Sequence, residues 1–387
     1  MLSEHIAKNH LHSYTDHVVA ISENAMPLSK MKYIQSFVLP FLMELSVLGQ
    51  HTNTKPEEKQ SHISIEIPEV HELMFVIYAL TEAGISDSMM INHNFDYYRK
   101  VMAHFSHHSH EKIVKKIGKK LPTHYNQIRM DAFNYHFDEQ GNVIKTNEHA
   151  HACWGRHDFL KPYLRDLKKF SAQSGFRDFY KSNCDYYSSL TQLIAKHGAL
   201  EQQTMWLESR FPIKHKHYTV VLSPLSYGMH ATNYQLEDVV VFVSAPDENS
   251  QLTKTIFDAQ VTRMLFTEID HNFVNPISDE YKAEIKKAFC DRKKWTAGKF
   301  TDGYVDEYAV FNEYMTWAIF ILYVMDTYSA EDFQTIKTHI ENTMMEYRGF
   351  IHFHWFVDRM IELYLKKEKT ASISDLFPNI LQQCARE

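Results

Sequence analysis

Hydrophobic and polar residues follow a strand-like pattern in four short stretches of the chain. Residues 63–67 alternate apolar and polar side chains, which is the period of a strand with one buried face. Residues 218–222 and 239–243 are runs of apolar, mainly β-branched residues, as in strands buried on both faces. Residues 132–145 carry a Gly-Asn turn signal between aromatic and β-branched residues, which indicates a hairpin or an irregular turn. The chain is therefore expected to form a small sheet.

Most of the remaining chain repeats apolar residues at the three- and four-residue spacing of helices. The clearest such stretches are residues 69–82, 97–120, 158–209 and 306–326. A further helix is expected after Pro246, and Asn275-Pro276 should end it because a residue before proline avoids helical backbone. Together these elements predict an α+β, mostly helical protein.

Composition supports a large, self-sufficient fold and narrows the range of partners. The 387 residues are 44% hydrophobic, and Gly and Pro number only 11 each, which favours helices and few long loops. The net charge of −7 argues against nucleic acid as the general partner. The glycine spacing matches neither dinucleotide-binding nor P-loop motifs, and the G-x-S-x-G motif of serine hydrolases is missing from the sequence.

The beginning of the chain bears on location. Residues 1–9 are polar and do not resemble a secretory signal, so we expect a cytoplasmic protein. Residues 37–48 are apolar, but they are shorter than the roughly 20 residues of a membrane span. They are expected to form a buried helix, with no membrane as partner. Four widely spaced cysteines suggest reduced thiols and not a metal motif.

The most informative motif is Thr267-Glu268-Ile269-Asp270-His271. It differs by one residue from the H-E-x-x-H motif of zinc peptidases, in which two histidines bind Zn²⁺ and the glutamate acts as general base. Here threonine replaces the first histidine. Because a neutral hydroxyl is a poor zinc ligand, the site lacks one donor unless another segment supplies it.

The order of elements around this motif is that of a zincin, in which strands precede a long helix bearing E-x-x-H. The third ligand should then come from a later helix, and Glu313 lies in an apolar stretch of residues 306–326. Two alternatives for Glu313 stay open: an exposed position, or an ion pair with an arginine such as Arg348. The candidates for the missing donor are His230, His352 and His354, whereas Asp270 points to the side of Thr267 on a helix and is an awkward substitute.

Other histidines gather in two places. His104, His107, His108 and His110 lie beside a run of lysines, which favours a solvated face over a metal or anion site. His149, His151 and His157 follow the predicted hairpin, where a hydrogen-bonded loop is favoured because no recognisable metal spacing is completed. An E-x-x-H pair also occurs in di-metal bundles, but a second pair in matching context is missing from the sequence.

Residues 266–276 resemble the active-site region of a bacterial family of uncharacterised domains regarded as gluzincin-type metallopeptidases, which typically read H-E-F-x-H-x-F-V-N-P. Weaker matching segments are residues 67–73, 98–110, 223–225, 312–313 and 348–350. The resemblance implies a metallopeptidase-like scaffold with His271 and Glu313 as zinc ligands and Glu268 as general base. Thr267 is the departure from this pattern.

Two functions follow as expectations. The first is zinc-dependent hydrolysis of a peptide, with Glu268 as base, His271, Glu313 and His230 as ligands, and Arg348 stabilising the oxyanion. The second is a catalytically inactive relative that binds a peptide or protein, which the missing ligand favours. In both, residues 1–200 form a mainly helical region, and residues 201–387 form a zincin-like region packed against it.

Overall fold

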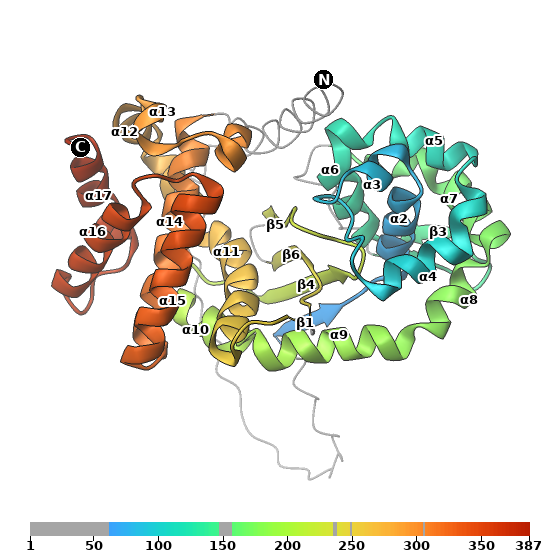
Figure 1. Cartoon of the computed structure of the whole chain (residues 1–387), viewed down its shortest axis with the longest axis horizontal. Helices are drawn as coiled ribbons and strands as arrows, with labels where there is room; N and C mark the ends of the chain where they lie inside the picture. Colours follow the sequence, from blue (N-terminus) through green and yellow to red (C-terminus); the bar gives the residue numbers. More distant parts are fainter. Residues whose placement is uncertain (1–61, 147–156, 235–237, 248–249, 305) are drawn as a thin grey trace, which may run out of the picture.

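The computed structural model describes residues 62–146, 157–234, 238–247, 250–304 and 306–387. Within them the protein is α+β and mostly helical, as the sequence predicts. Figure 1 shows a small sheet at the centre, with one group of helices on each side. The predictions for residues 1–9 and 37–48 and for His149 and His151 lie outside the described residues.

The central sheet has the strand order β1-β4-β6-β5. Its strands are β1 (Ile63–Glu66), β4 (His217–Ser223), β5 (Ala231–Tyr234) and β6 (Asp238–Ser244). β1, β4 and β6 run parallel, and β5 pairs antiparallel with β6. Three of the four strands match predicted stretches. β5 was not predicted, because its sequence Ala-Thr-Asn-Tyr is too short and too polar to show a pattern.

The predicted hairpin is present as a separate two-stranded sheet. It joins β2 (Tyr135–Phe137) to β3 (Val143–Lys145) in antiparallel register. Asp138 closes the turn by accepting a hydrogen bond from the backbone N–H of Asn142 at 2.7 Å. Gly141 adopts a left-handed conformation with φ of 71°, which glycine reaches without steric cost.

Most helices of the first half lie on one side of the sheet, but the last of them, Leu200–Arg210, packs against the long helix Lys254–Glu280 on the other side (Figure 1). The helices of this half are α2 (Glu69–Ala79), α3 (Glu82–Ser86), α4 (Asp96–Phe105), α5 (Lys112–Gly118), α6 (Leu121–Phe133), α7 (Leu164–Ser174), α8 (Phe176–Ser182), α9 (Cys184–His197) and α10 (Leu200–Arg210). Two short 3-10 turns, η2 (Ser106–His108) and η4 (Lys161–Tyr163), lie among them. The continuous helix predicted over residues 97–120 is therefore wrong. Its polar middle, residues 106–111, offers no apolar side chain to the core, and the helix breaks there.

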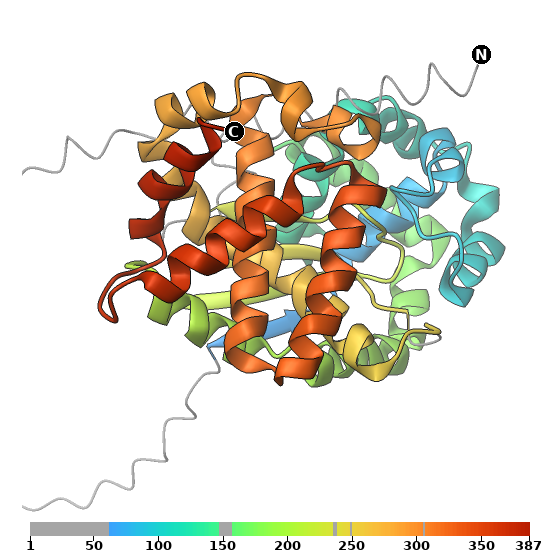
Figure 2. The same ribbon diagram turned by 60° about the vertical axis from the view of Figure 1, so that its left-hand side comes forward.

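Helices of the second half lie on the other side. They are α11 (Lys254–Glu280), α12 (Lys282–Ala288), α13 (Arg292–Trp295), α14 (Glu307–Thr327), α15 (Ala330–Asn342), α16 (Phe353–Lys366) and α17 (Phe377–Cys384). Three short turns accompany them: η5 (Lys299–Gly303), η6 (Thr343–Arg348) and η7 (Ser374–Leu376). Figure 2 shows α14, α15 and α16 side by side, in orange to red.

The prediction that Asn275-Pro276 ends the long helix is wrong, because α11 continues through Pro276 to Glu280. Proline removes one helical N–H and disturbs the carbonyl four residues earlier. Tertiary bonds hold the segment in place nevertheless: the Tyr308 hydroxyl donates to the Asn275 carbonyl at 3.2 Å, and Ser278 Oγ donates to Asn312 Oδ1 at 2.6 Å. Burial against α14 thus outweighs the local preference of proline.

The two halves share one hydrophobic core. β1, from the predicted region 1–200, pairs with β4, from region 201–387, and buried apolar residues from Ile67 to Cys384 form one main cluster. Among the described helices, α14 is long and apolar enough to cross a membrane, but 94% of its most apolar window is buried inside the protein. This burial is typical of a core helix, and α14 positions part of the candidate site.

Candidate functional site

Helix α11 presents the motif residues near its middle. Thr267 is buried, with 4% of its surface exposed, and its hydroxyl donates to the Arg263 carbonyl one turn earlier at 3.0 Å. Hydroxyls of Ser and Thr inside helices commonly form this bond to the preceding turn. Thr267 therefore uses its one side-chain proton within the helix, at the position where the zinc-peptidase motif has a metal ligand.

Packing of α14 against α11 brings together the two other predicted ligands. His271 Nε2 lies 4.0 Å from Glu313 Oε1, and both side chains are largely buried. The other ring nitrogen of His271, Nδ1, lies 3.3 Å from Asn275 Oδ1. Burial lowers the pKa of His271, and the nearby Glu313 carboxylate partly opposes this. The pair thus has a neutral imidazole facing a carboxylate.

Glu313 also has a cationic partner. Arg348 places one guanidinium nitrogen 3.0 Å from Glu313 Oε2, so the ion pair considered as an alternative from the sequence is present. That oxygen has no aligned hydrogen bond within the described structure, which makes the contact an ion pair and not a bidentate hydrogen bond. Arg348 also donates to the Tyr304 hydroxyl.

Local backbone geometry directs Arg348 into the site. It is the last residue of η6, a π-helical turn that continues α15 and ends at Gly349. Gly349 has φ of 91°, and a Cβ there would lie 2.7 Å from the Gly298 carbonyl oxygen. Only glycine fits this position without rearrangement, because both the conformation and the close approach exclude a side chain.

Two arginines meet on one tryptophan. The guanidinium carbons of Arg263 and Arg348 lie 4.4 Å and 4.6 Å from the centre of the Trp317 ring. Arginine favours such contacts because its planar cation interacts with the electron-rich face of the ring. Burial and the neighbouring Arg348 charge lower the pKa of Arg263 to about 10, so it stays charged at neutral pH. Arg263 was not predicted as a site residue from the sequence, although it lies one helical turn before Thr267.

A third arginine, Arg129, comes from α6 on the other side of the sheet. It is only 1% exposed and contacts the ring of Tyr125, with its guanidinium carbon 4.9 Å from the ring centre. Its Nε and one terminal nitrogen have no hydrogen-bond partner among the described residues. Of the three arginines, Arg129 acts most strongly to lower the pKa of Glu268, so it lies within electrostatic reach of the motif.

The carboxyl group of Glu268 is held in its protonated form. Burial and the adjacent Glu313 charge raise its pKa to about 8, while the three arginines oppose the rise. Asp270 on the same helix is fully buried, and burial together with Glu268 and Glu313 raises its pKa well above the usual range. At neutral pH the site therefore contains fewer carboxylate charges than its acidic residues suggest.

The three histidines considered as replacement ligands do not join His271 and Glu313. His230 Nε2 lies 2.9 Å from Ser244 Oγ, and burial with the charges of Arg263, Arg129 and Arg348 lowers its pKa to about 3. His352 packs its ring against Trp295, with 5.6 Å between centres. His354 Nδ1 lies 2.9 Å from Glu341 Oε1, in a different cluster.

The residues around His271 do not fit the zinc site that the motif implies. Such a site needs three protein donors that converge on one ion at about 2.0–2.2 Å. Here His271 and Glu313 supply two, the hydroxyl of Thr267 is bonded inside its helix, and the second oxygen of Glu313 faces Arg348. Within the described part of the chain, three donors come within 4.8 Å of one another at Glu341, His354 and Asp358 instead.

That second cluster already contains a cation. Lys337 Nζ lies 2.5 Å from Glu341 Oε1 and 3.2 Å from Asp358 Oδ1. An ammonium group in this position satisfies the two carboxylates and competes with a metal ion for them. We interpret the cluster as an ion-pair network that joins α15 to α16.

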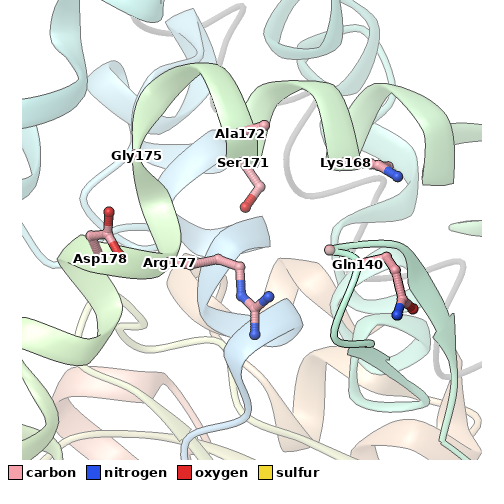
Figure 3. Close-up of a pocket in the computed structure, with 8 residues that line it drawn as sticks. Gln140, Lys168, Ser171, Ala172, Gly175, Arg177 and Asp178 are labelled. Atoms are coloured by element: carbon pink, nitrogen blue, oxygen red, sulfur yellow. The ribbon is translucent and has the colours of Figure 1, made fainter.

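A pocket of about 190 Å³ lies far along the chain from the motif, between the β2–β3 turn and the junction of α7 with α8 (Figure 3). Its lining residues are Gln140, Gly141, Lys168, Ser171, Ala172, Gly175, Arg177 and Asp178. Arg177 is already paired with Glu69 at 3.0 Å. None of the predicted site residues lines this pocket.

The histidine cluster before α5 takes part in ordinary local contacts. His104 Nε2 lies 3.2 Å from the Ser174 carbonyl, and His108 Nδ1 lies 3.7 Å from Glu111 Oε1. His107 and His110 are exposed. These contacts agree with the interpretation of the cluster as a surface feature.

Fold and site together define an α+β protein in which one long helix carries a Thr-Glu-x-x-His motif beside a glutamate and two arginines stacked on a tryptophan. Residues 155–383, more than half of the chain, match the family described as Domain of unknown function (DUF4932), and the chain belongs to that family. No curated protein and no solved structure matches the chain. The matched range includes Arg263, Glu268 and Arg348, whereas β1 and Arg129 precede it.

Proposed function

We propose that this protein is a non-catalytic binding module on a metallopeptidase-like scaffold, and that it binds a peptide or protein without zinc. The observation that carries this proposal is the ion pair between Arg348 and Glu313, at 3.0 Å. Arg348 places its cation beside Glu313, where the zinc-peptidase motif predicts a metal ion. The hydroxyl of Thr267, which donates within its own helix, supports the same conclusion, because it stands in place of an imidazole ligand and a neutral hydroxyl is a poor zinc ligand.

A peptide is the favoured ligand for two reasons. The resemblance of residues 266–276 to a metallopeptidase motif argues for it by analogy. In addition, β5 is the last strand in the order of the described sheet and contacts α11 through Asn272 Nδ2, which donates to Thr232 Oγ1 at 2.9 Å. An extended peptide can pair with such an edge strand through its backbone.

The test is elemental analysis of full-length protein purified without chelators or a histidine tag. We expect less than about 0.1 zinc per chain in the wild type and in Glu268→Gln, and an increase toward one zinc in Thr267→His, which restores the third donor. Near-stoichiometric zinc in the wild type, lost in both His271→Ala and Glu313→Ala, would overturn the proposal.

The second candidate is a zinc-dependent peptide hydrolase with an altered ligand set. The 4.0 Å separation of His271 Nε2 and Glu313 Oε1, with Glu268 on the same helix, favours it. In that case Glu268 would be the base, Arg348 would stabilise the oxyanion, and another donor, such as His230 after a rotation away from Ser244, would complete the site. Glu268→Gln should then abolish peptide cleavage while leaving the metal bound.

A further inference from the structure

A concentration of basic residues on two neighbouring helices is the starting observation. Residues 112–120 and 161–169 hold nine lysines and arginines but only one acid, Asp166, although the whole chain has 41 basic and 48 acidic residues. The nine are Lys112, Lys115, Lys116, Lys119, Lys120, Lys161, Arg165, Lys168 and Lys169. This part of a net acidic protein is therefore strongly basic, and a local charge of this kind attracts anionic partners.

The fold joins the nine residues into one surface, which we call the basic face. Helix α5 packs against α7, and Lys116 Nζ on α5 lies 2.5 Å from Asp166 Oδ2 on α7. The other eight residues are exposed, whereas apolar positions between them, such as Ile117 and Leu167, are buried in the core. Within the described residues Lys116 is the one member of the face with an ion-pair partner. In this part of the structure the face therefore presents mainly unpaired cations to solvent.

The pocket of about 190 Å³ borders the basic face, because Lys168 belongs to both. Gln140 and Lys168 are exposed at its rim, so the pocket is open to solvent. Figure 3 shows the side chains of Ser171 and Arg177 directed toward the space between α7 and the β2–β3 turn. Asp178, the one acid among the lining residues, lies at the other end of the pocket from Lys168 and Gln140. The end next to the basic face is thus lined by hydrogen-bond donors.

Arg177 is held so that one donor group remains for a ligand. Its Nε lies 3.0 Å from Glu69 Oε1, and its Nη1 donates to the Asp138 carbonyl at 3.4 Å. Its other terminal nitrogen, Nη2, has no hydrogen bond within the described structure. Lys168 Nζ is held in a similar way, because it donates to Asn142 Oδ1 at 2.6 Å. Contacts of this kind orient both cations before a ligand arrives, which lowers the entropy cost of binding.

The pocket favours one kind of anionic partner over the others. A cavity of ~150 Å³ holds benzene, so this pocket has room for one acidic side chain. A bilayer or a nucleic acid duplex presents its charges on a broad surface that does not enter such a hollow, whereas a peptide side chain does. Eight of the nine cations are also lysines, which act as flexible point charges, whereas phosphate recognition favours the planar fork of arginine. The carboxylates of an acidic peptide fit both observations.

We propose that the basic face binds an acidic segment of a partner protein, with one Asp or Glu side chain of that segment in the pocket. There its carboxylate accepts hydrogen bonds from Arg177 and Ser171 and lies near the ammonium group of Lys168. The remaining carboxylates of the segment pair with lysines of α5 and α7. Figure 1 shows α5 and α7 at the edge of the molecule opposite to α16 and α17, so this surface is separate from the motif on α11. The inference therefore does not depend on the proposed function.

The experiment uses full-length protein and a fluorescein-labelled peptide of alternating Glu and Gly residues, with binding measured by fluorescence anisotropy. The control peptide carries Gln in place of every Glu. We expect the Glu peptide to bind at least tenfold more tightly than the Gln peptide. Its affinity should fall as salt is raised, because most of the contacts are exposed to solvent. Equal binding of the two peptides would overturn the inference.

Variants locate the binding surface. The triple variant Arg165→Gln, Lys168→Gln and Lys169→Gln should weaken binding of the Glu peptide about tenfold, as expected for the loss of three solvent-exposed ion pairs. The matched control makes the same change in net charge at exposed positions of α12 and α13: Lys286→Gln, Lys287→Gln and Lys293→Gln. Equal losses in the two triple variants would show that net charge alone attracts the peptide, and would overturn the assignment to this face.

Ala172→Phe tests the pocket without a change of charge. Ala172 is an exposed residue of α7 that lines the pocket, so a phenyl ring there should fill the space and weaken binding of the Glu peptide at least threefold. Ala283→Phe, at an exposed position of α12, is the control and should bind like the wild type. Unchanged binding by Ala172→Phe would overturn the role of the pocket.

Three further probes separate an acidic peptide from other anionic partners. They are a phosphoserine peptide of the same net charge, polyuridine RNA, and vesicles that contain phosphatidylserine. We expect each to bind more weakly than the Glu peptide, and equal or tighter binding of any of them would overturn the choice of ligand. The zinc content of the protein bears on the motif of α11 alone, so failure of this inference and failure of the proposed function give different results.

Discussion

Glu268→Gln tests the electrostatic description of the site most directly. An ordinary glutamate has a pKa of 4.5, and the pKa of Glu268 is raised to about 8. Between these values the unfolded chain releases the proton and the folded protein retains it, so the free energy of unfolding falls as pH rises. Each pH unit in this window is worth ~1.4 kcal/mol. Ionisation of Glu268 should therefore lower the free energy of unfolding of the wild type by ~2–3 kcal/mol between pH 5 and pH 7.

Glutamine is close in shape to the protonated acid and has no proton to lose, so the variant avoids that cost. We expect Glu268→Gln to be more stable than the wild type at pH 7 by ~3 kcal/mol, and nearly equal to it at pH 4.5. The direction follows from the sign of the shift: stability due to a raised carboxyl pKa is complete at low pH and is lost as pH rises through the folded value.

The assay is urea unfolding followed by circular dichroism at pH 4.5, 5, 6, 7 and 8, with the difference in the free energy of unfolding between variant and wild type plotted against pH. Taking the difference cancels the other titrating groups. Glu284→Gln is the control, because Glu284 is an exposed residue of α12 and should give a flat line. A flat line for Glu268→Gln as well, or a variant less stable at every pH, would refute the reasoning.

Three further predictions concern the same region. Glu313→Gln should lower the free energy of unfolding in urea by ~3 kcal/mol, because it removes the carboxylate charge that faces Arg348. Adding Arg348→Met should recover part of this loss, and simply additive losses would contradict the pairing. Pro276→Ala should raise the free energy of unfolding by up to ~3 kcal/mol, because the Asn272 carbonyl regains a helical N–H donor. A lower melting temperature for this variant would contradict the prediction. Thr267→Val should cost only ~1 kcal/mol or less, since the lost hydroxyl bonds only within the helix; a loss above ~3 kcal/mol would reveal another role for it.

Periodicity in the sequence predicted much of the fold, because core packing repeats along each element. The strands β1, β4 and β6 and the helix α14 follow from it, as does the hairpin with its turn at Gly141. The prediction at Pro276 was wrong for a physical reason. The local preference of proline competes there with side-chain bonds from α14, and those partners lie some 30 residues further along the chain.

The candidate site was predictable only in part. The motif itself drew attention to Glu268 and His271, and an acid within an apolar helix drew attention to Glu313. Arg263 and Arg129 had a weaker signal, a single charge within an otherwise apolar helical stretch, and that pattern also describes many surface positions. Their electrostatic effect on Glu268 depends on how α6 and α11 pack in the fold, and no local sequence pattern records that packing.

The π-helical turn at η6 fixes the direction in which Arg348 points. A π-turn holds one residue more than the α-turn that would span the same stretch of helix. Removing one residue from Thr343–Arg348 would restore regular helix and rotate the following side chains by about 100°. Arg348 would then turn away from Glu313. Relatives without this extra residue should therefore lack the ion pair, and their Glu313 equivalent would be available to a metal.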